Sequence, residues 1–468
     1  MISETSSAKL LQISNRDWWA MPTAEVEEFQ LALLKQRFAA LREGVATLDK
    51  MAKLQKIHQL DSLDDAVPLL FQHTAYKSYP MSFLVKGRFQ ALTEWLDKLT
   101  MHDLSGVDAS GCTSIDDWFQ LLDDQTPLAI NHSSGTSGKL SIIPRDKEEA
   151  EHFATCTMKN FEGFGEQPNM VADILAGNKK IPVIFPNYRY GRHGGNRMFR
   201  SLAARYCNPG ESFALYEDEL MSADVACLSG RVAAAEAKGE LDSLEISPEL
   251  LAKFRASQNL AERRQEQSES FFKRVLEHCQ GRQVYISGVV PFLMNWTYMG
   301  EERGLSKVFA PDTLISTGGG AKGMVLPEDW RERVENFLGA SFYTNFGTSE
   351  SISQLPGCSQ GNYHPLPYHI PFILDPDSGQ PKPREGRQTG RYAFYDLLAE
   401  SYWGGFLTGD EVTATWGGCP CGREGFYMHP TVQRFSDKTG EDDKITCAGA
   451  ADAHERAMEF LNEQARDA

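Results

Sequence analysis

Segment 131–139 contains the residue types that bind phosphate groups. It reads Asn-His-Ser-Ser-Gly-Thr-Ser-Gly-Lys and follows residues 127–130, an apolar run that predicts a buried strand. Glycines let backbone N–H groups turn toward an anion, hydroxyl groups donate to phosphate oxygens, and the lysine adds charge. The spacing of Gly135 and Gly138 excludes a Walker A loop, and glycine directly after Ser137 excludes a nucleophile elbow. A surface turn without a ligand is the alternative.

A second glycine-rich loop spans 318–323 and reads Gly-Gly-Gly-Ala-Lys-Gly after a predicted strand. This pattern fits G-x-G-x-x-G, which is typical of a dinucleotide-binding turn. Pro327 delays the next helix, and no acidic strand end follows at the required distance. A dinucleotide-dependent oxidoreductase is therefore a distant alternative.

Two further loops present carboxylates. Segment 345–350 reads Asn-Phe-Gly-Thr-Ser-Glu, and a hydroxyl beside the Glu350 carboxylate suits Mg²⁺ held against a phosphate. Ser349 and Glu350 are also good first-turn residues of a helix. Segment 407–410, Leu-Thr-Gly-Asp, places Asp410 where it could accept hydrogen bonds from both hydroxyls of a ribose; a plain hairpin turn is the alternative.

The periodicity of apolar residues predicts the elements that must position these loops. Strands are expected at 127–130, 181–185, 284–287, 313–316 and 341–345, and helices at 24–57, 146–162, 328–338 and over most of 211–280. This alternation of strand, glycine loop and helix predicts an α/β architecture with a largely parallel sheet, in which ligands bind at the carboxyl ends of strands.

The composition of the chain and its expected secondary structure change after about residue 360. Prolines become frequent, and residues 390–435 predict short antiparallel strands. A last helix is expected at about 451–464. The polar stretch 436–442 predicts a domain boundary.

Composition limits the classes of function. The 468 residues carry a formal net charge of −17, which argues against general nucleic-acid binding. No apolar run has the length of a membrane span, and the first residues lack the apolar core of a signal peptide, so we expect a cytoplasmic protein. The nine cysteines are more consistent with metal ligands or free thiols than with a disulfide framework.

The four loops, in this order, resemble the adenylate-forming superfamily of acyl-CoA synthetases, adenylation domains and luciferases. The resemblance implies an α/β large domain of mixed and parallel sheets flanked by helices. It would cover residues 1–435, with a small β subdomain at about 360–435. Residues 436–468 would then be a vestige of the superfamily's C-terminal domain.

The resemblance also implies roles for individual residues. Phosphate contacts would come from the first loop: Ser133, Ser134, Gly135, Thr136, Ser137, Gly138 and Lys139. The adenine and acyl sites would be lined by Gly319, Gly320 and Ala321, and Phe346 and Gly347 would lie near adenine. Ser349 and Glu350 would hold phosphate and Mg²⁺, and Asp410 would bind the ribose. Catalytic roles fall on Lys139, Ser349 and Glu350. Ser137, Phe346 and Leu140 depart mildly from the residues usual at these places.

The phenylacetate–CoA ligase-like and coenzyme F390 synthetase-like branch is the most similar subgroup. Its Cys-x-Cys-Gly-Arg tail appears here at 419–423, and the 440–444 stretch is similar too. Members carry a Cys…His…Cys-x-Cys set, which implies a structural zinc site at Cys358, His364, Cys419 and Cys421; soft sulfur with one imidazole suits zinc. His369 is the competing histidine, and buried thiols without metal are the alternative.

Only a short tail follows Asp410 and Lys444 is the last lysine, so we expect the superfamily's usual C-terminal domain to be shortened here. Nothing beyond Lys444 can play the usual catalytic lysine role. The chain also resembles the acyl-protein synthetases of fatty-acid reductase systems, which transfer the acyl group to one of their own cysteines. Cys447 occupies a comparable place, and a thiolate is a good acyl acceptor. A small buried hydrophobe is the favoured alternative for Cys447.

Together these features predict an AMP-forming carboxylate ligase that uses ATP and Mg²⁺ to form an acyl-adenylate. The acyl group would pass to CoA, a protein thiol or an amine. Segments 185–198 and 287–291 are expected to face the acid, with a solvated loop as the alternative. Self-acylation on Cys447 and a non-catalytic nucleotide- or acyl-binding protein remain open, and an acyl-accepting protein partner or an oligomer is compatible with the sequence.

Overall fold

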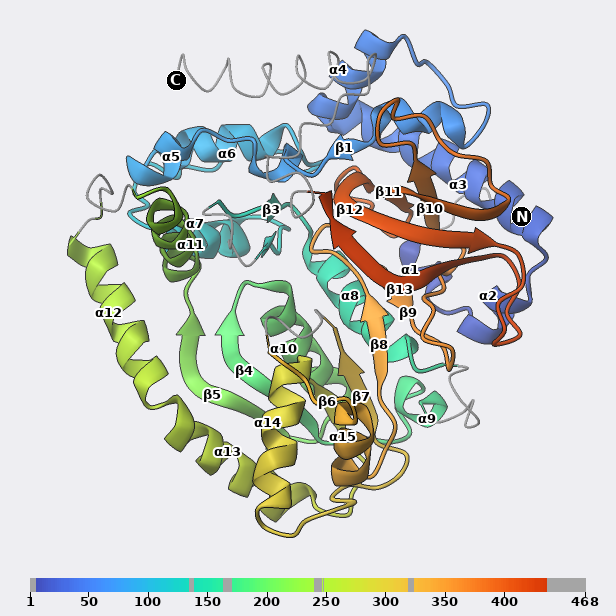
Figure 1. The fold of residues 1–468 in the computed structure, drawn as a ribbon. Helices are drawn as coiled ribbons and strands as arrows, with labels where there is room; N and C mark the ends of the chain where they lie inside the picture. Colours follow the sequence, from blue (N-terminus) through green and yellow to red (C-terminus); the bar gives the residue numbers. More distant parts are fainter. Residues whose placement is uncertain are drawn as a thin grey trace.

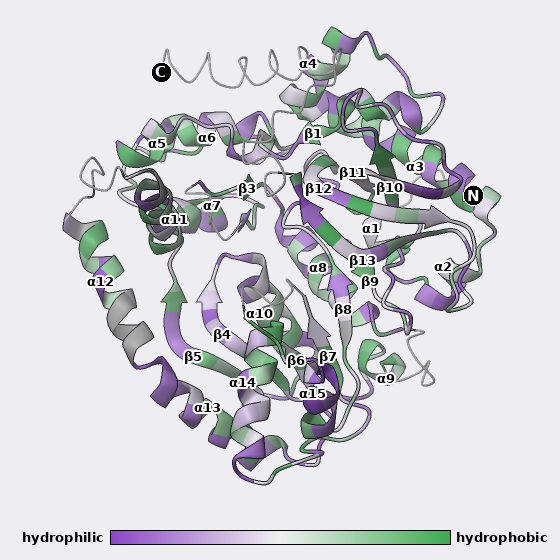
Figure 2. Cartoon of the chain, in the orientation of Figure 1, coloured by the Kyte–Doolittle hydropathy of each residue, from purple (hydrophilic) through white to green (hydrophobic). Residues whose placement is uncertain are grey.

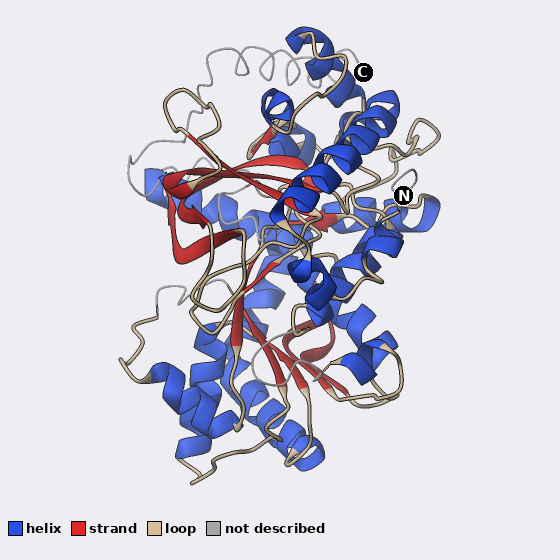
Figure 3. Cartoon of the chain, turned by 90° about the vertical axis from the view of Figure 1, so that its right-hand side faces the viewer, coloured by secondary structure: helices blue, strands red, loops and turns tan. Residues whose placement is uncertain are grey.

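The computed structural model describes residues 6–133, 139–162, 171–239, 246, 248–318 and 324–435 (Figure 1). Two sheets lie one above the other, with helices packed around both (Figure 3). Within the described ranges, no helix combines the length and the apolar character that a membrane span needs.

The lower sheet has six strands in the order β5-β4-β6-β7-β8-β9. They are β4 (Val183–Gly191), β5 (Ser212–Met221), β6 (Tyr285–Ser287), β7 (Leu314–Thr317), β8 (Tyr343–Phe346) and β9 (Leu355–Pro356). All pairings from β5 to β8 are parallel, whereas β9 runs antiparallel to β8.

Helices cover both faces of this sheet, so its strands are apolar on both sides. Ile184, Ile286 and Ile315 pack against α13 (Arg264–Cys279), α14 (Val290–Glu301) and α15 (Trp330–Leu338). Their strand neighbours face the other way, toward α8 (Lys147–Lys159), α9 (Ala172–Leu175) and α10 (Gly194–Tyr206). Along α13 hydrophobic and hydrophilic residues alternate (Figure 2), as a helix with one buried face requires.

The upper sheet has five strands. β10 (His369–Leu374), β11 (Gly386–Asp396), β12 (Gly405–Trp416) and β13 (Phe426–Arg434) are antiparallel, and β1 (Phe71–Gln72) adds to β12 in parallel. The α-helices of the N-terminal part are α1 (Ser7–Leu10), α2 (Asn15–Ala20), α3 (Thr23–Gly44), α4 (Ala46–Gln55), α5 (Met81–Val85), α6 (Phe89–Asp97) and α7 (Ile115–Gln125), and two 3₁₀ turns cover Asp64–Leu69 and Ala75–Lys77. These helices and the sheet share one hydrophobic core. The expected antiparallel β region is therefore confirmed and is packed onto the N-terminal helices.

Two segments complete the architecture. The short strands β2 (Asn131–His132) and β3 (Ile142–Ile143) form a hairpin between the two sheets, and α11 (Ala223–Lys238) and α12 (Pro248–Glu262) run from β5 to α13 along the outside of the molecule (Figure 1).

Two expectations about secondary structure were wrong, at 24–57 and 127–130, and a third missed one strand. The single helix expected at 24–57 is broken at Val45, which is extended and separates α3 from α4. The segment expected to be mostly helical at 211–280 contains α11, α12 and α13, as expected, but it begins with strand β5, whose pairing with β4 overrides its acidic, helix-favouring composition. Residues 127–130 precede the strand instead of forming it, because the hairpin starts at Asn131. The boundary at 436–442 and the helix at 451–464 lie outside the described residues.

Candidate functional site

The β2–β3 hairpin carries the expected phosphate loop. The N–H of Ser133 donates to the carbonyl of Ser141 over 3.1 Å, and the N–H of Ser141 donates to Ser133 Oγ over 2.9 Å. These bonds close the base of the loop. The predicted phosphate contacts Ser134, Gly135, Thr136, Ser137 and Gly138 lie outside the described residues, as do Gly319, Gly320 and Ala321 of the second loop.

Lys139 leaves this loop and packs against an aromatic ring. Its Nζ lies 4.6 Å from the ring centroid of Tyr79, whose hydroxyl donates to the carbonyl of Leu140 over 2.9 Å. Burial and, to a smaller extent, the positive charge of Lys77 together lower the pKa of Lys139 to about 8. A negative charge close to such a buried lysine stabilises its protonated form strongly and raises its pKa again.

The pKa of Lys139 predicts how ATP affinity changes with pH. The free ammonium loses its proton as the pH rises through about 8, so we expect the KM for ATP to increase between pH 7 and 9.5. The Lys139→Met variant has no charge to lose, and its KM should be high and change little over this range. A KM that rises equally in both proteins would contradict the prediction.

The loop after β8 is tied to the base of the hairpin. The carbonyl of Ser349 accepts from Asn131 Nδ2 over 2.8 Å and from Arg145 Nη2 over 2.9 Å, and Arg145 also donates to the carbonyl of Ser351. The hydroxyl of Tyr402 donates to the carbonyl of Glu350 over 2.9 Å. The structure thus brings together two loops that are separated by about 200 residues in the sequence and were predicted to share a site.

Glu350 projects from this loop with its side chain only partly exposed. Burial raises the pKa of its carboxyl group, and hydrogen bonding and the charges of Arg145 and Lys77 oppose the rise. The loop beyond it is fixed by Asp396, whose Oδ2 accepts from the N–H groups of Ile352 and Ser353 over 2.6 and 2.8 Å. Asp396 was not among the predicted residues.

Asp410 lies on β12 and is buried, and its partner was missed by the sequence analysis. Its Oδ1 lies 2.9 Å from Nε of Arg434, which is directly opposite on β13. The Oγ of Thr408 donates to the carbonyl of Tyr392, and the Tyr392 ring lies 5.5 Å from that of Phe346. Tyr392 on β11 therefore lies between the part of β12 that carries Asp410 and the ring of Phe346.

A cavity of about 940 Å³ opens at the carboxyl ends of β4, β6, β7 and β8. Its lining includes the predicted acid-facing residues Phe185, Asn187, Tyr188, His193, Met198, Ser287 and Pro291, together with Gly318, Gly347 and Ser349. Segments 185–198 and 287–291 thus face a cavity, as expected. Lys139, Phe346, Glu350 and Asp410 are not among the lining residues that the structure describes.

The lining of this cavity contains polar and basic residues but no acidic ones among the residues that the structure describes. The protein as a whole, in contrast, is strongly acidic. Five lining residues have a buried polar atom with no hydrogen-bond partner among the described residues: Asn131 Oδ1, Arg145 Nε, Trp296 Nε1, Thr317 Oγ1 and Thr348 Oγ1. Buried polar atoms are normally paired, so this group, in which every atom but Asn131 Oδ1 can donate, marks a place for a polar ligand that carries acceptor atoms.

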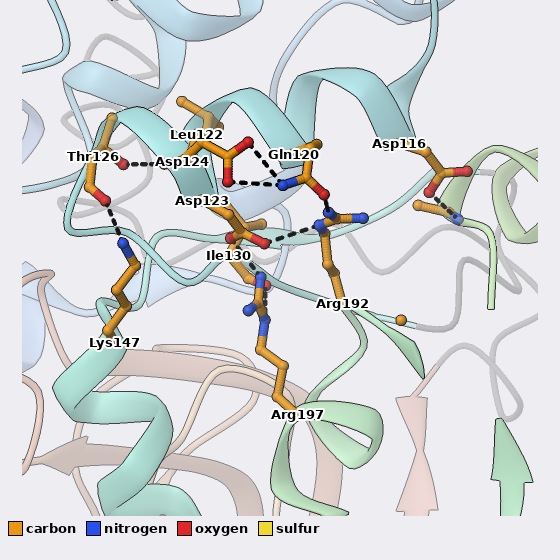
Figure 4. Close-up of polar contacts among 12 residues, drawn as sticks. Asp116, Gln120, Leu122, Asp123, Asp124, Thr126, Ile130, Lys147, Arg192 and Arg197 are labelled. Carbon is orange, nitrogen blue, oxygen red and sulfur yellow. Dashed lines mark hydrogen bonds and ion pairs between the residues drawn. The ribbon is translucent and has the colours of Figure 1, made fainter. Parts of the chain in front are cut away.

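The three arginines of the 185–198 segment have other roles. Arg192 Nε and Arg197 Nη2 contact the two oxygens of Asp123 on α7 over 3.0 and 2.7 Å, as Figure 4 shows, and Arg189 pairs with Glu217. Arg197 Nε also donates to the carbonyl of Ile130, just before the hairpin. This network joins the start of α10 to the base of the phosphate loop.

Replacing Asp123 with asparagine should remove the shared counterion of two half-buried guanidinium groups. We expect the free energy of unfolding, measured with urea, to fall by about 2 kcal/mol. The matched control is Asp124→Asn, because Asp124 is exposed and contacts only Gln120 in Figure 4. Equal losses in the two variants would show that the Asp123 network is not stabilising.

The predicted zinc ligands converge. One ligand atom from each of Cys358, His364, Cys419 and Cys421 can be chosen so that all four lie within 4.8 Å of one another. Bonds of about 2.1–2.3 Å around a tetrahedral zinc place neighbouring ligand atoms about 3.5–3.8 Å apart, so small side-chain shifts suffice. Burial, with Arg423 adding, lowers the pKa of His364 to about 3, which keeps the imidazole in its neutral, ligating form.

His369 is outside this cluster. Its Nδ1 lies 2.8 Å from Ser353 Oγ and its Nε2 lies 2.8 Å from the Tyr392 hydroxyl. Both ring nitrogens are therefore in hydrogen bonds between β10, β11 and the loop after β8. The competing assignment of His369 as a metal ligand is not supported by this geometry.

Comparison with known proteins gives one partial sequence match and a set of fold matches. No family model matches the chain. Over 119 residues it is 34% identical to phenylacetate-coenzyme A ligase of Thermus thermophilus, a stretch that covers 23% of this chain and about a quarter (25%) of that protein.

Solved structures of 2-hydroxyisobutyryl-CoA ligase share the fold at 14% identity. The open conformation, in complex with 2-HIB-AMP and CoA, gives a TM-score of 0.52 over 88% of this chain and 70% of that chain. The postadenylation state in complex with R3-HIB-AMP gives 0.53 over 89% and 69%.

Proposed function

We propose, from the fold of the adenylate-forming superfamily that this chain has, that the protein activates a carboxylic acid with ATP. A carboxylate oxygen would attack the α-phosphorus, the bond from that phosphorus to the bridging oxygen would break, and pyrophosphate would leave. The product is an acyl-adenylate. The observation that carries the proposal is the cavity without acidic lining residues beside the joined hairpin and Glu350 loops.

We assign the predicted residues to two groups: those that would bind the phosphates and the metal, and those that would bind the adenine and the ribose. Lys139 and Ser133, with the loop between them, would bind the β- and γ-phosphates, and Ser349 and Glu350 would hold phosphate and metal. Mg²⁺, when bound, would offset the phosphate charge. Phe346 would lie near the adenine, and Asp410 would accept from the ribose hydroxyls.

Catalysis in this scheme is mostly positioning and charge stabilisation. Asn131 and Arg145 support this role because they fix the Ser349 carbonyl from the hairpin side. Tyr402 and Asp396 fix the same loop from the upper sheet. These hydrogen bonds would hold the Glu350 loop in place before the nucleotide binds.

The acyl acceptor is proposed to be a thiol. CoA is the first candidate, and the chain's own Cys447 is the alternative; Cys447 and the 436–468 segment lie outside the described residues. A labelled acyl-enzyme that disappears in a Cys447→Ser variant would favour self-acylation, and an unchanged label would exclude it.

Acid-dependent ATP–pyrophosphate exchange tests the proposed activation. A panel of aliphatic and aromatic acids should include at least one that supports exchange, and Lys139→Ala should lower its rate strongly. Exchange with no acid, together with measurable ATP binding, would instead support a non-catalytic nucleotide-binding protein.

A further inference from the structure

Arg145 is the most buried cation of the cavity. It directly follows the β2–β3 hairpin, and 2% of the residue is exposed. Its guanidinium carbon lies 5.0 Å from the ring centroid of Phe153, and its Nη2 donates to the carbonyls of Ser349 and Ser351. The guanidinium group brings a positive charge to the cavity wall.

This charge has no carboxylate ion-pair partner within 4 Å in the described part of the chain. Carbonyl dipoles, an aromatic face, the Tyr402 hydroxyl and the more distant Glu350 carboxylate offset it only in part, and its Nε has no hydrogen-bond partner there. Burying a cation without a counterion in direct contact is costly. An uncharged donor could make the same hydrogen bonds to the carbonyls of Ser349 and Ser351, so these bonds alone do not explain why the residue is charged.

The surroundings indicate which anion would supply the counter-charge. Arg145 and Asn131 both donate to the Ser349 carbonyl, so they lie side by side at the hairpin end of the cavity. The cavity extends from there toward the aromatic residues Phe185, Tyr188 and Trp296. An acid whose apolar part fills the aromatic region would present its carboxylate at the hairpin end, near the phosphates.

We infer that Arg145 offsets the charge of the reacting carboxylate and selects acids over their neutral analogues. The inference rests on the proposed acid activation. Glu350 and Lys139 would serve metal and phosphates, whereas Arg145 would serve the second substrate. The Ser349 carbonyl that it binds fixes its position, so the charge is oriented before the acid enters.

Binding of paired probes tests this role. Benzoate and hexanoate are each compared with benzamide and hexanamide by calorimetry, using the wild-type protein, Arg145→Met, Arg145→Lys and Arg264→Met. Arg264 is the matched control because it lines the same cavity but is exposed. The wild type and Arg264→Met should prefer at least one acid over its amide by about tenfold or more.

Arg145→Met should lose this preference while it binds the amide as before, and Arg145→Lys should keep most of it because the charge remains. A purely structural role predicts that both variants lose acid and amide binding together. If Arg145→Met does not fold, Arg145→Lys decides: loss of acid preference in a folded lysine variant overturns the inference. No acid preference in the wild type also overturns it.

Exchange assays separate this inference from the proposed function. With an acid that supports exchange, Arg145→Met should raise the KM for the acid and leave the KM for ATP unchanged, and Arg145→Lys should change both values little. A raised KM for ATP alone would assign the charge to a phosphate and overturn the inference. Acid preference without any exchange would keep the role of Arg145 and reject adenylation.

Discussion

Replacing Glu350 with glutamine is expected to lower acid-dependent ATP–pyrophosphate exchange by about 100- to 1000-fold. The variant keeps the size of the side chain and removes one negative charge at the proposed metal and phosphate site. Its backbone should stay in place, because the contacts that hold the loop use the carbonyls of Ser349, Glu350 and Ser351. The measurement is exchange under saturating acid and ATP, with Mg²⁺ varied.

The effect must be separated from a general loss of structure. Glu328→Gln is the matched control, because Glu328 is exposed and precedes α15. Urea unfolding of both variants should match the wild type. Because burial raises the pKa of Glu350, removing its charge should not destabilise the protein. Exchange near the wild-type rate in Glu350→Gln would remove Glu350 from the mechanism.

Much of the lower sheet could be predicted because the signal is local. The strands expected at 284–287, 313–316 and 341–345 are present as β6, β7 and β8, shifted by one or two residues. Each is a short apolar run that ends at a polar or glycine loop, and helices cover both faces. The loops at their carboxyl ends were therefore expected at one edge, where the cavity lies.

The failures arise from contacts between distant segments. The chain leaves the helical conformation at Val45 because the N–H of Thr47 bonds to the carbonyl of Lys98, and a Cβ at Gly44 would lie 2.4 Å from the sulfur of Met101. Residues 24–57 contain no local sign of either contact. Strand β5 is likewise stabilised by its parallel pairing with β4, not by its own sequence.

The site shows the same division. Residue type and spacing singled out the loops of Lys139, Ser349 and Glu350, which the structure brings together at the base of the hairpin; the roles of these residues are proposals. Arg434 could not, because its contact with Asp410 depends on the register of β12 and β13, which contains an irregularity between Val412 and Ala414. Arg145 was not predicted, because its burial and its contact with the Ser349 carbonyl depend on the packing of distant segments.

The second large prediction is that the purified protein contains zinc. It follows from the cluster of four possible ligands, Cys358, His364, Cys419 and Cys421. Two come from the loop after β9 and two from the turn between β12 and β13, so a bound zinc would join the Glu350 loop's continuation to the strand that carries Asp410. The backbone already favours this arrangement, since Cys358 N–H donates to the carbonyl of Asn362 and Cys419 N–H to that of Arg423. We propose one zinc per chain with a structural role.

Replacing Cys419 with serine should remove this zinc and lower the free energy of unfolding by about 3 kcal/mol or more, because metal binding contributes directly to folding at such sites. Metal content is measured by mass spectrometry of the purified chain and stability by urea unfolding, before and after treatment with a chelator. The chelator should destabilise the wild type and have little further effect on Cys419→Ser. Cys112→Ser is the control, since Cys112 lies outside the cluster. A wild-type protein that contains no zinc after expression with added zinc would show that these cysteines are buried thiols.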